Sequence, residues 1–102
     1  MPLLMHLLMH RQVSEKVKGG KLVRLHVECS DIIQKVTITG DFFLHPEDKL
    51  ELIEKALIGL PLTLSEEDLQ RRIKAVVDAE CIEMVGIAPD VIARLIKQAV
   101  TQ

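Results

Sequence analysis

Aromatic side chains are almost absent from this sequence. Of its 102 residues only Phe42 and Phe43 are aromatic, and it has no tryptophan or tyrosine. A row of rings on which single-stranded bases could stack is therefore excluded. Basic residues are not in excess either, because 13 Lys and Arg stand against 15 Asp and Glu. With a net charge of -2, the chain has no overall basic field that would favour nucleic acid or an anionic membrane.

Cysteines and long apolar runs are also scarce. Cys29 and Cys81 form no CxxC pair, which argues against a zinc ribbon or a disulfide-rich secreted scaffold and favours a reducing, cytoplasmic location. The apolar run at 3–9 is interrupted by His6 and is far shorter than the roughly 20 residues that span a bilayer. It also lacks the basic start and the cleavage site of a secretory signal. We expect one compact domain with a radius of gyration of about 13 Å.

The start of the chain differs in pattern from the rest. We expect residues 1–10 to be a poorly ordered N-terminal extension and residues 11–102 to form the domain. His6 and His10 have the i,i+4 spacing of metal ligands on a helix, but neither a glutamate nor a third ligand accompanies them. We therefore interpret them as tail residues and predict no metal site.

Alternation of apolar and polar residues predicts three strands. Residues 21–29 alternate strictly, so that four apolar side chains share one face: Val23, Leu25, Val27 and Cys29. A second strand is predicted over 33–42, and a weaker one over 13–18. Gly19-Gly20 supplies the permissive backbone for a tight reversal. These segments predict a three-stranded antiparallel meander.

Beyond the strands the apolar spacing changes to three and four residues, which is typical of helices. One helix is predicted from Pro46 to Gly59, and a second is capped by Ser65 and starts with an acidic turn. A last helix follows Pro89, whereas 81–86 could be a continued helix or a connector. The order predicts an α+β fold in which a three-stranded antiparallel sheet is followed by about three helices packed on one face.

No arrangement of residues typical of catalysis is evident. His26 and His45 have neither an orienting partner nor a nucleophile nearby in the pattern. The paired glycines lack the flanking residues of a dinucleotide or Walker phosphate loop. We predict that this chain has no catalytic centre of its own.

Two segments near strand ends could contact a partner. In 18–21, lysines flank two glycines, a pattern that suits a phosphate or an acidic surface but equally a solvated hairpin tip. In 40–43, adjacent rings on a strand point to opposite faces, so Phe43 projects outward if Phe42 fills the core. Alternatively both rings wrap around the core at a bend. Asp41 could bond loop amides or a neighbouring chain.

Several of these segments together resemble a known family. The segments are Lys18-Gly19-Gly20-Lys21-Leu22, Val36 to Phe43, Pro46-Glu47 and Leu57 to Pro61. In this order and spacing they resemble the carboxy-terminal accessory domain of lipoate-protein ligases, over residues 11–100. The chain departs from the pattern at Ser30-Asp31, where relatives often have a glycine.

The resemblance implies the non-catalytic small subunit of a split lipoate-protein ligase. It implies a heterodimer in which the catalytic subunit binds ATP, magnesium and lipoate, while this chain binds no cofactor or metal. This subunit would be needed to activate lipoate to lipoyl-AMP, which the partner passes to a lysine in lipoyl domains of 2-oxoacid dehydrogenase complexes or the glycine cleavage protein. The residues that we expect to contact the partner, or to lie near its substrate, are Lys18, Gly19, Gly20, Lys21, Asp41 and Phe43.

The same resemblance leaves an alternative, because the implied fold is similar to that of iron-sulfur scaffold and sulfur-acceptor proteins. In that case Cys29 or Cys81 would be the sulfur acceptor, which requires an exposed thiolate. The pattern places both cysteines in apolar registers, which favours small core residues.

Overall fold

The computed structural model of the chain describes residues 8–17 and 21–101. The strands are β1 (Met9–Val17), β2 (Lys21–Cys29), β3 (Ile33–Gly40), β4 (Phe43–His45) and β5 (Glu83–Val85). The helices are a 3-10 turn η2 (Glu47–Lys49), α1 (Leu50–Leu57), α2 (Glu66–Ala79) and α3 (Pro89–Val100). None of the helices in the described part is long and apolar enough to cross a membrane.

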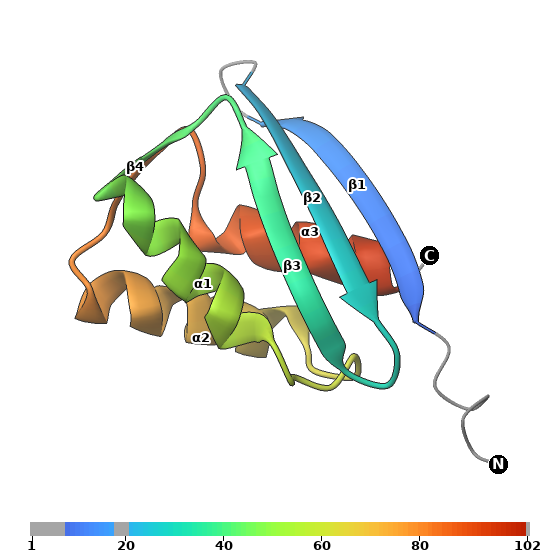
Figure 1. Cartoon of the computed structure of the whole chain (residues 1–102). Helices are drawn as coiled ribbons and strands as arrows, with labels where there is room; N and C mark the ends of the chain where they lie inside the picture. Colours follow the sequence, from blue (N-terminus) through green and yellow to red (C-terminus); the bar gives the residue numbers. More distant parts are fainter. Residues whose placement is uncertain (1–7, 18–20, 102) are drawn as a thin grey trace, which may run out of the picture.

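The three long strands form the predicted antiparallel sheet in the order β1-β2-β3 (Figure 1). β1 is longer than the segment 13–18 that the pattern predicts. It pairs with β2 along its whole length, from Met9 opposite Cys29 to Val17 opposite Lys21. Pairing with a strongly patterned neighbour therefore extends a strand whose own alternation is weak. Residues 1–7 lie outside the described residues.

The helices cover one face of this sheet, which confirms the α+β prediction. α3 packs across β1 and β2, α1 packs against β3, and α2 packs on both of these helices (Figure 1). The inward side chains of β2 are fully buried, as the alternation predicts: Val23, Leu25, Val27 and Cys29. Arg94 of α3 is paired with Glu15 of β1, which ties the last helix to the edge strand.

The second helix begins as predicted. The Ser65 hydroxyl oxygen accepts a hydrogen bond of 3.1 Å from the backbone N–H of Asp68, and Leu69 and Ile73 point into the core. The first predicted helix is divided into η2 and α1, and Pro46 precedes η2 as its cap instead of starting an α-helix.

β3 is shorter than the segment 33–42 that the pattern predicts. It ends at Gly40 and does not continue through Phe42. After Gly40 the N–H of Asp41 donates to the carbonyl oxygen of Leu22 at 2.8 Å, and the chain leaves the sheet. Phe43 then starts β4, which pairs antiparallel with β5 as a separate two-stranded ribbon. The ambiguous segment 81–86 therefore contains a strand, β5, whose backbone pairs with β4.

α1 protects the outer edge of β3. One carboxylate oxygen of Glu54 accepts a hydrogen bond of 2.9 Å from the backbone N–H of Ile38, a donor on the edge strand of the described sheet. Burial raises the pKa of Glu54 above its ordinary value, and the bond from Ile38 only partly opposes this. Covering the edge therefore places a carboxylate where its charged form is poorly solvated.

This raised pKa predicts how glutamine at position 54 affects stability. The native state binds a proton on Glu54 more readily than the unfolded chain does, so this group adds stability as the pH falls through its folded-state pKa. That contribution is lost as the pH rises again. Glu54→Gln keeps an acceptor for Ile38 and removes the poorly solvated charge. We expect the variant to be more stable than the parent at neutral pH, with the advantage shrinking towards about pH 4.

Urea unfolding at the two pH values measures this difference. Glu54→Leu leaves the Ile38 N–H without its acceptor and is expected to lower the free energy of unfolding by about 1–3 kcal/mol. Glu83→Gln, an exposed carboxylate on β5, is the control and should change stability by less than about 0.5 kcal/mol. An advantage for Glu54→Gln that is equal at both pH values would contradict the assignment.

Candidate functional site

Lys21 and Asp41, two of the described residues predicted as contacts, lie at one end of the sheet. Lys18, Gly19 and Gly20 lie outside the described residues. Lys21 starts β2, and Asp41 follows the end of β3 with its N–H bonded to the residue after Lys21. Of the six residues predicted from the sequence, the structure therefore brings Lys21 and Asp41 together.

The ribbon of β4 and β5 joins this end through Gly86. A Cβ atom built on Gly86 would lie 3.5 Å from the Lys21 Cγ atom and 3.5 Å from the Phe42 Cα atom. The end of β5 therefore touches both the start of β2 and the connection from β3 to β4. We call the surface made by Lys21, Asp41, Phe43 and Val85 the candidate docking surface.

Phe43 is the most exposed large hydrophobic residue in the part of the chain that the structure describes. Its exposed fraction is 66%, and that of Val85 is 56%. The two are direct partners in the β4–β5 pairing, so their side chains share the outer face of the ribbon. Phe42 packs against the core and Leu44 is buried, so Phe43 projects outward. Sequence reasoning identified Phe43 but missed Val85, because the position of Val85 follows from the pairing of β5 with β4.

An open groove adjoins the candidate docking surface. It has a volume of about 490 Å³ and runs between the end of β1 and the start of α3, with Gly86 on its border. Its apolar lining comes from Val17, Ile87 and Val91, and Lys16 and Asp90 add charges of opposite sign. Phe43 itself lines a different, smaller hollow of about 190 Å³, together with Phe42, Leu44, Glu47 and Leu50.

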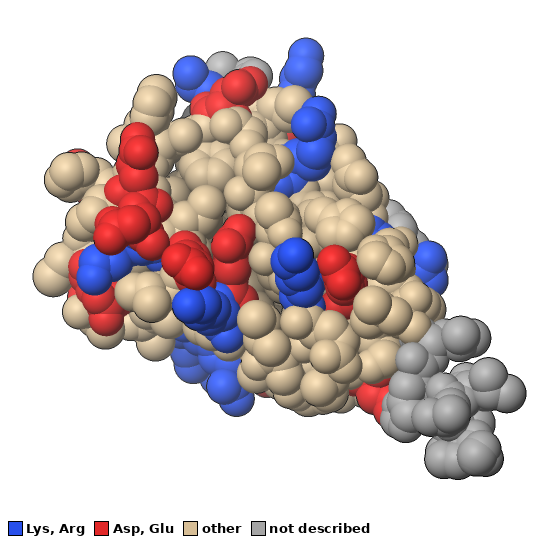
Figure 2. All heavy atoms as spheres, in the orientation of Figure 1, with Lys and Arg blue, Asp and Glu red and all other residues tan. Residues whose placement is uncertain are grey.

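Charge on the visible face is mixed. Figure 2 shows Lys and Arg interspersed with Asp and Glu, and no continuous basic area on that face. Acidic side chains gather over η2 and the first turn of α1, where Glu47, Asp48 and Glu51 lie. This distribution agrees with the low net charge and does not favour a phosphate backbone as the partner.

The two cysteines have different environments. Cys29 is fully buried, and burial raises the pKa of its thiol, with Arg11 acting in the opposite direction. Cys81 is exposed, so the prediction that it is a core residue is wrong. α2 ends at Ala79, and Cys81 adopts a positive φ of 53° in the turn to β5, which buries Ile82 instead. A sulfur acceptor would have to be Cys81, because its side chain is exposed and that of Cys29 is buried.

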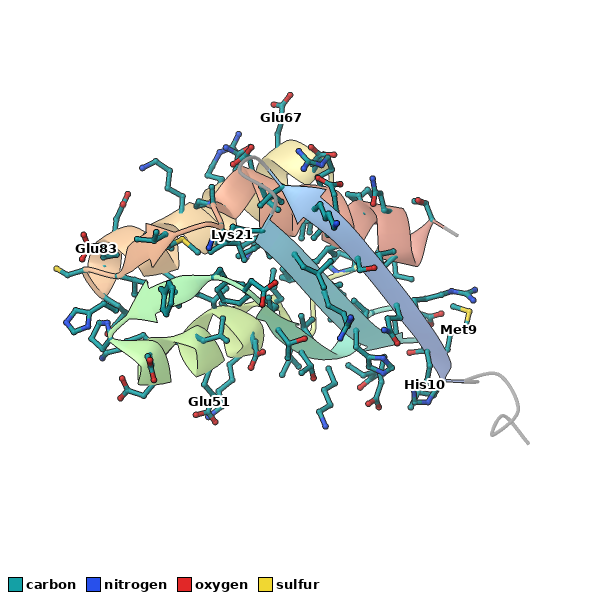
Figure 3. All side chains as sticks on the ribbon, turned by 90° about the horizontal axis from the view of Figure 1, so that it is seen from above. Met9, His10, Lys21, Glu51, Glu67 and Glu83 are labelled. Atoms are coloured by element: carbon teal, nitrogen blue, oxygen red, sulfur yellow. The ribbon has the colours of Figure 1, made fainter. Side chains whose placement is uncertain are left out.

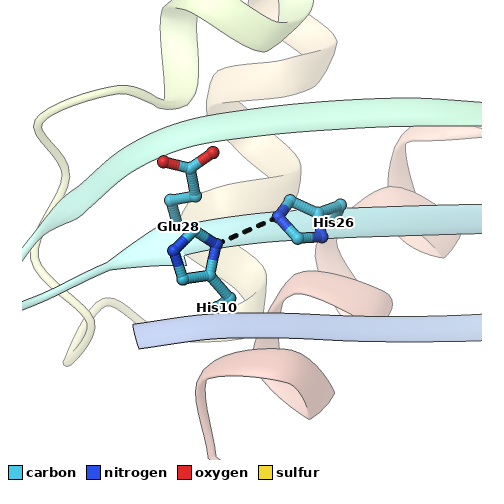
Figure 4. A group of neighbouring side chains, drawn as sticks. All are labelled: His10, His26 and Glu28. Atoms are coloured by element: carbon cyan, nitrogen blue, oxygen red, sulfur yellow. Dashed lines mark hydrogen bonds between the residues drawn. The ribbon is translucent and has the colours of Figure 1, made fainter. Parts of the chain in front are cut away.

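The structure also groups three polar side chains on the outer face of the sheet. His10 lies on β1 and not on a helix with His6, which lies outside the described residues. It faces Glu28 directly across the β1–β2 pairing, and His26 lies two residues before Glu28 on the same face. Figure 4 shows the two rings beside each other. The His10 Nδ1 atom lies 3.5 Å from the His26 Nε2 atom.

Sequence reasoning missed this group because it assigned His10 to a tail. A signal was available: a hairpin in which Val17 pairs with Lys21 pairs residues whose numbers add up to 38. Continuing that register places His10 opposite Glu28. The register needs β1 to continue as far as Met9, and the weak alternation before Val13 did not indicate this.

The chain was compared with known proteins. Residues 9–96 match the family model described as the C-terminus of bacterial lipoate protein ligase. Comparison with curated proteins gives no match. Among solved structures, the chain is similar to one described as part of an archaeal lipoylation system, a bipartite lipoate protein ligase and its E2 lipoyl domain from Thermoplasma acidophilum. The TM-score is 0.67 at 22% identity, covering 90% of this chain and 97% of that chain.

Proposed function

Because this chain belongs to the family of bacterial lipoate protein ligase C-terminal domains, we propose that it acts as the accessory subunit of a bipartite lipoate protein ligase. The family match carries this proposal, since it spans all the strands and nearly all the helical layer of the described fold. The structurally similar chain supports a separate subunit. It belongs to a bipartite ligase, and the match with this chain covers 97% of its length.

The partner of this chain would be the catalytic subunit, in a cytoplasmic heterodimer. ATP, magnesium and lipoate would bind to that subunit, which joins the lipoate carboxylate to AMP and releases pyrophosphate. It would then transfer the lipoyl group to a lysine of a lipoyl domain, in a 2-oxoacid dehydrogenase complex or the glycine cleavage system. This chain would supply no group that reacts with either substrate.

The contribution of the accessory chain would be conformational. A docked protein accelerates activation only if it binds the active arrangement of the catalytic subunit more tightly than the inactive one. Couplings of this kind are typically about 1–3 kcal/mol, or roughly 5-fold to 150-fold in population. The candidate docking surface suits this role, because Phe43 and Val85 form an exposed apolar pair. Gly86, which follows Val85, lies against Lys21 and borders an open groove. Lys18, Gly19 and Gly20 remain predicted contacts.

Reconstitution tests the proposal. The chain and the catalytic subunit from the same organism are assayed separately and together for pyrophosphate release that depends on both lipoate and ATP. We expect the mixture to form lipoyl-AMP about 5-fold to 150-fold faster than the catalytic subunit alone, and this chain alone to form none. The proposal fails if the mixture is no faster, or if this chain activates lipoate unaided.

A further inference from the structure

We infer that His10, His26 and Glu28 form a binding site for a divalent transition-metal ion, with Zn²⁺ as the best-fitting ion. The ligand atoms of the three side chains all lie within 4.8 Å of one another. Imidazole nitrogen and carboxylate oxygen are a donor set that zinc commonly uses, with a fourth position left for water or another ligand. This inference concerns a different surface from the proposed docking and is independent of it.

The strand register holds the three donors in place. Glu28 and His26 lie on the same face of β2, two residues apart, and His10 is the direct cross-strand partner of Glu28. Two strands of a regular hairpin therefore supply all three ligands, and no loop has to be ordered for them to meet. His10 is exposed while His26 and Glu28 are half-buried, so the fourth position opens to solvent.

The distances agree with tetrahedral coordination. For zinc–nitrogen bonds of about 2.0–2.1 Å, two ligand atoms at tetrahedral positions lie about 3.3 Å apart. The His10 Nδ1 and His26 Nε2 atoms are 3.5 Å apart, close to that length. The ring centroids are 5.6 Å apart and the planes are tilted by 47°, so the rings are not stacked face to face. The Glu28 carboxylate lies within 4.8 Å of the histidine ligand atoms, so a side-chain rotation can bring it into the coordination shell.

The glutamate is available as a ligand. Among the residues that the structure describes, no hydrogen bond or ion pair engages the Glu28 carboxylate. Lys35 lies opposite Glu28 on β3 and is the nearest cation by register, but it makes no ion pair with it in the described structure. A metal bound between the two histidines would therefore take up a carboxylate for which the described residues show no other partner.

The site lies at the other end of the hairpin from the candidate docking surface. Figure 3 places His10 and Lys21 at opposite ends of the β1–β2 pair, which agrees with the pairing of Val17 with Lys21. A bound ion would join the free edge strand β1 to the central strand β2. Because metal binding to the folded state stabilises that state, zinc should raise the unfolding temperature.

Zinc titration of the tag-free chain tests the site by calorimetry and thermal unfolding. We expect one Zn²⁺ per chain, a rise in the unfolding temperature, and a Co²⁺ absorption spectrum typical of tetrahedral coordination. Loss of a residue that only hydrogen-bonds to a metal ligand costs a metal site about 10-fold to 100-fold in affinity, so loss of a direct ligand should cost at least that. His10→Gln, His26→Gln and Glu28→Gln should each weaken zinc binding at least about 10-fold.

Matched variants distinguish this site from other donors. His6→Gln, His45→Gln and Cys81→Ser remove the other two histidines and the exposed thiol, and each should leave affinity unchanged. The unfolding temperature in the presence of EDTA checks that each variant folds. The inference is overturned if zinc does not bind, if binding ignores His26→Gln, or if it depends on His6 or Cys81. None of these outcomes affects the reconstitution test of the proposed function.

Discussion

Phe43→Asp is expected to weaken binding to the catalytic subunit of lipoate protein ligase by about 100-fold or more, equivalent to about 2.7 kcal/mol. Aromatic residues in the centre of an interface often contribute this much, and an aspartate there would bury an unpaired charge. Phe43 is 66% exposed in this chain and stands beside Val85, so it has much apolar surface to lose on binding. Its removal should cost the free chain little stability.

Binding affinity and lipoyl-AMP formation should be measured together. If Phe43 only docks, a saturating concentration of the variant restores the rate of activation, whereas a residue that also shifts the conformation lowers the rate at saturation. Ile58→Asp is the matched control, because Ile58 is 47% exposed and lies beyond the end of α1, away from the candidate docking surface. Equal binding by Phe43→Asp and the parent would remove the docking assignment, even if reconstitution succeeds.

Gly40→Ala is expected to destabilise the fold by roughly 3 kcal/mol or more. A Cβ atom at this position would lie 2.1 Å from the carbonyl oxygen of Leu22, and the residue has a φ of +150°. The Leu22 oxygen is held by the N–H of Asp41, so it has little freedom to move away. Since domains of this size unfold with about 5–15 kcal/mol in total, the loss would be a large part of the stability.

Two causes contribute to the loss expected at Gly40: the clash with the Leu22 carbonyl oxygen and the positive φ. Gly59→Ala measures the second cause without the first. Gly59 also has a positive φ, of +88°, but a Cβ atom there would meet nothing within 4 Å. Its replacement should cost about 1–2 kcal/mol, from the backbone conformation alone. Urea unfolding of both variants measures the difference, which reports the clash with β2. Equal losses would show that the close approach at Gly40 is relieved by a small movement of the strands.

Elements whose evidence lies within a few neighbouring residues were predicted well from the pattern. β2 alternates strictly because its inward side chains are all buried, and α2 begins at Ser65 because the hydroxyl caps the N–H of Asp68. Both depend on local periodicity or on a bond spanning three residues. The outward direction of Phe43 was one of two outcomes left open, since a bend could have turned both rings inward.

The remaining features depend on pairing between segments far apart in the chain. β5 exists because β4 lies beside it, and this pairing exposes Val85 next to Phe43. β1 reaches Met9 because β2 continues opposite it, and this brings His10 to Glu28. Short segments carry too little apolar periodicity to predict such partners. Periodicity and capping therefore predicted the sheet and the helical layer. Long-range pairing, which follows from packing the whole core, decided the direction of Phe43 and placed Val85 beside it and His10 beside Glu28.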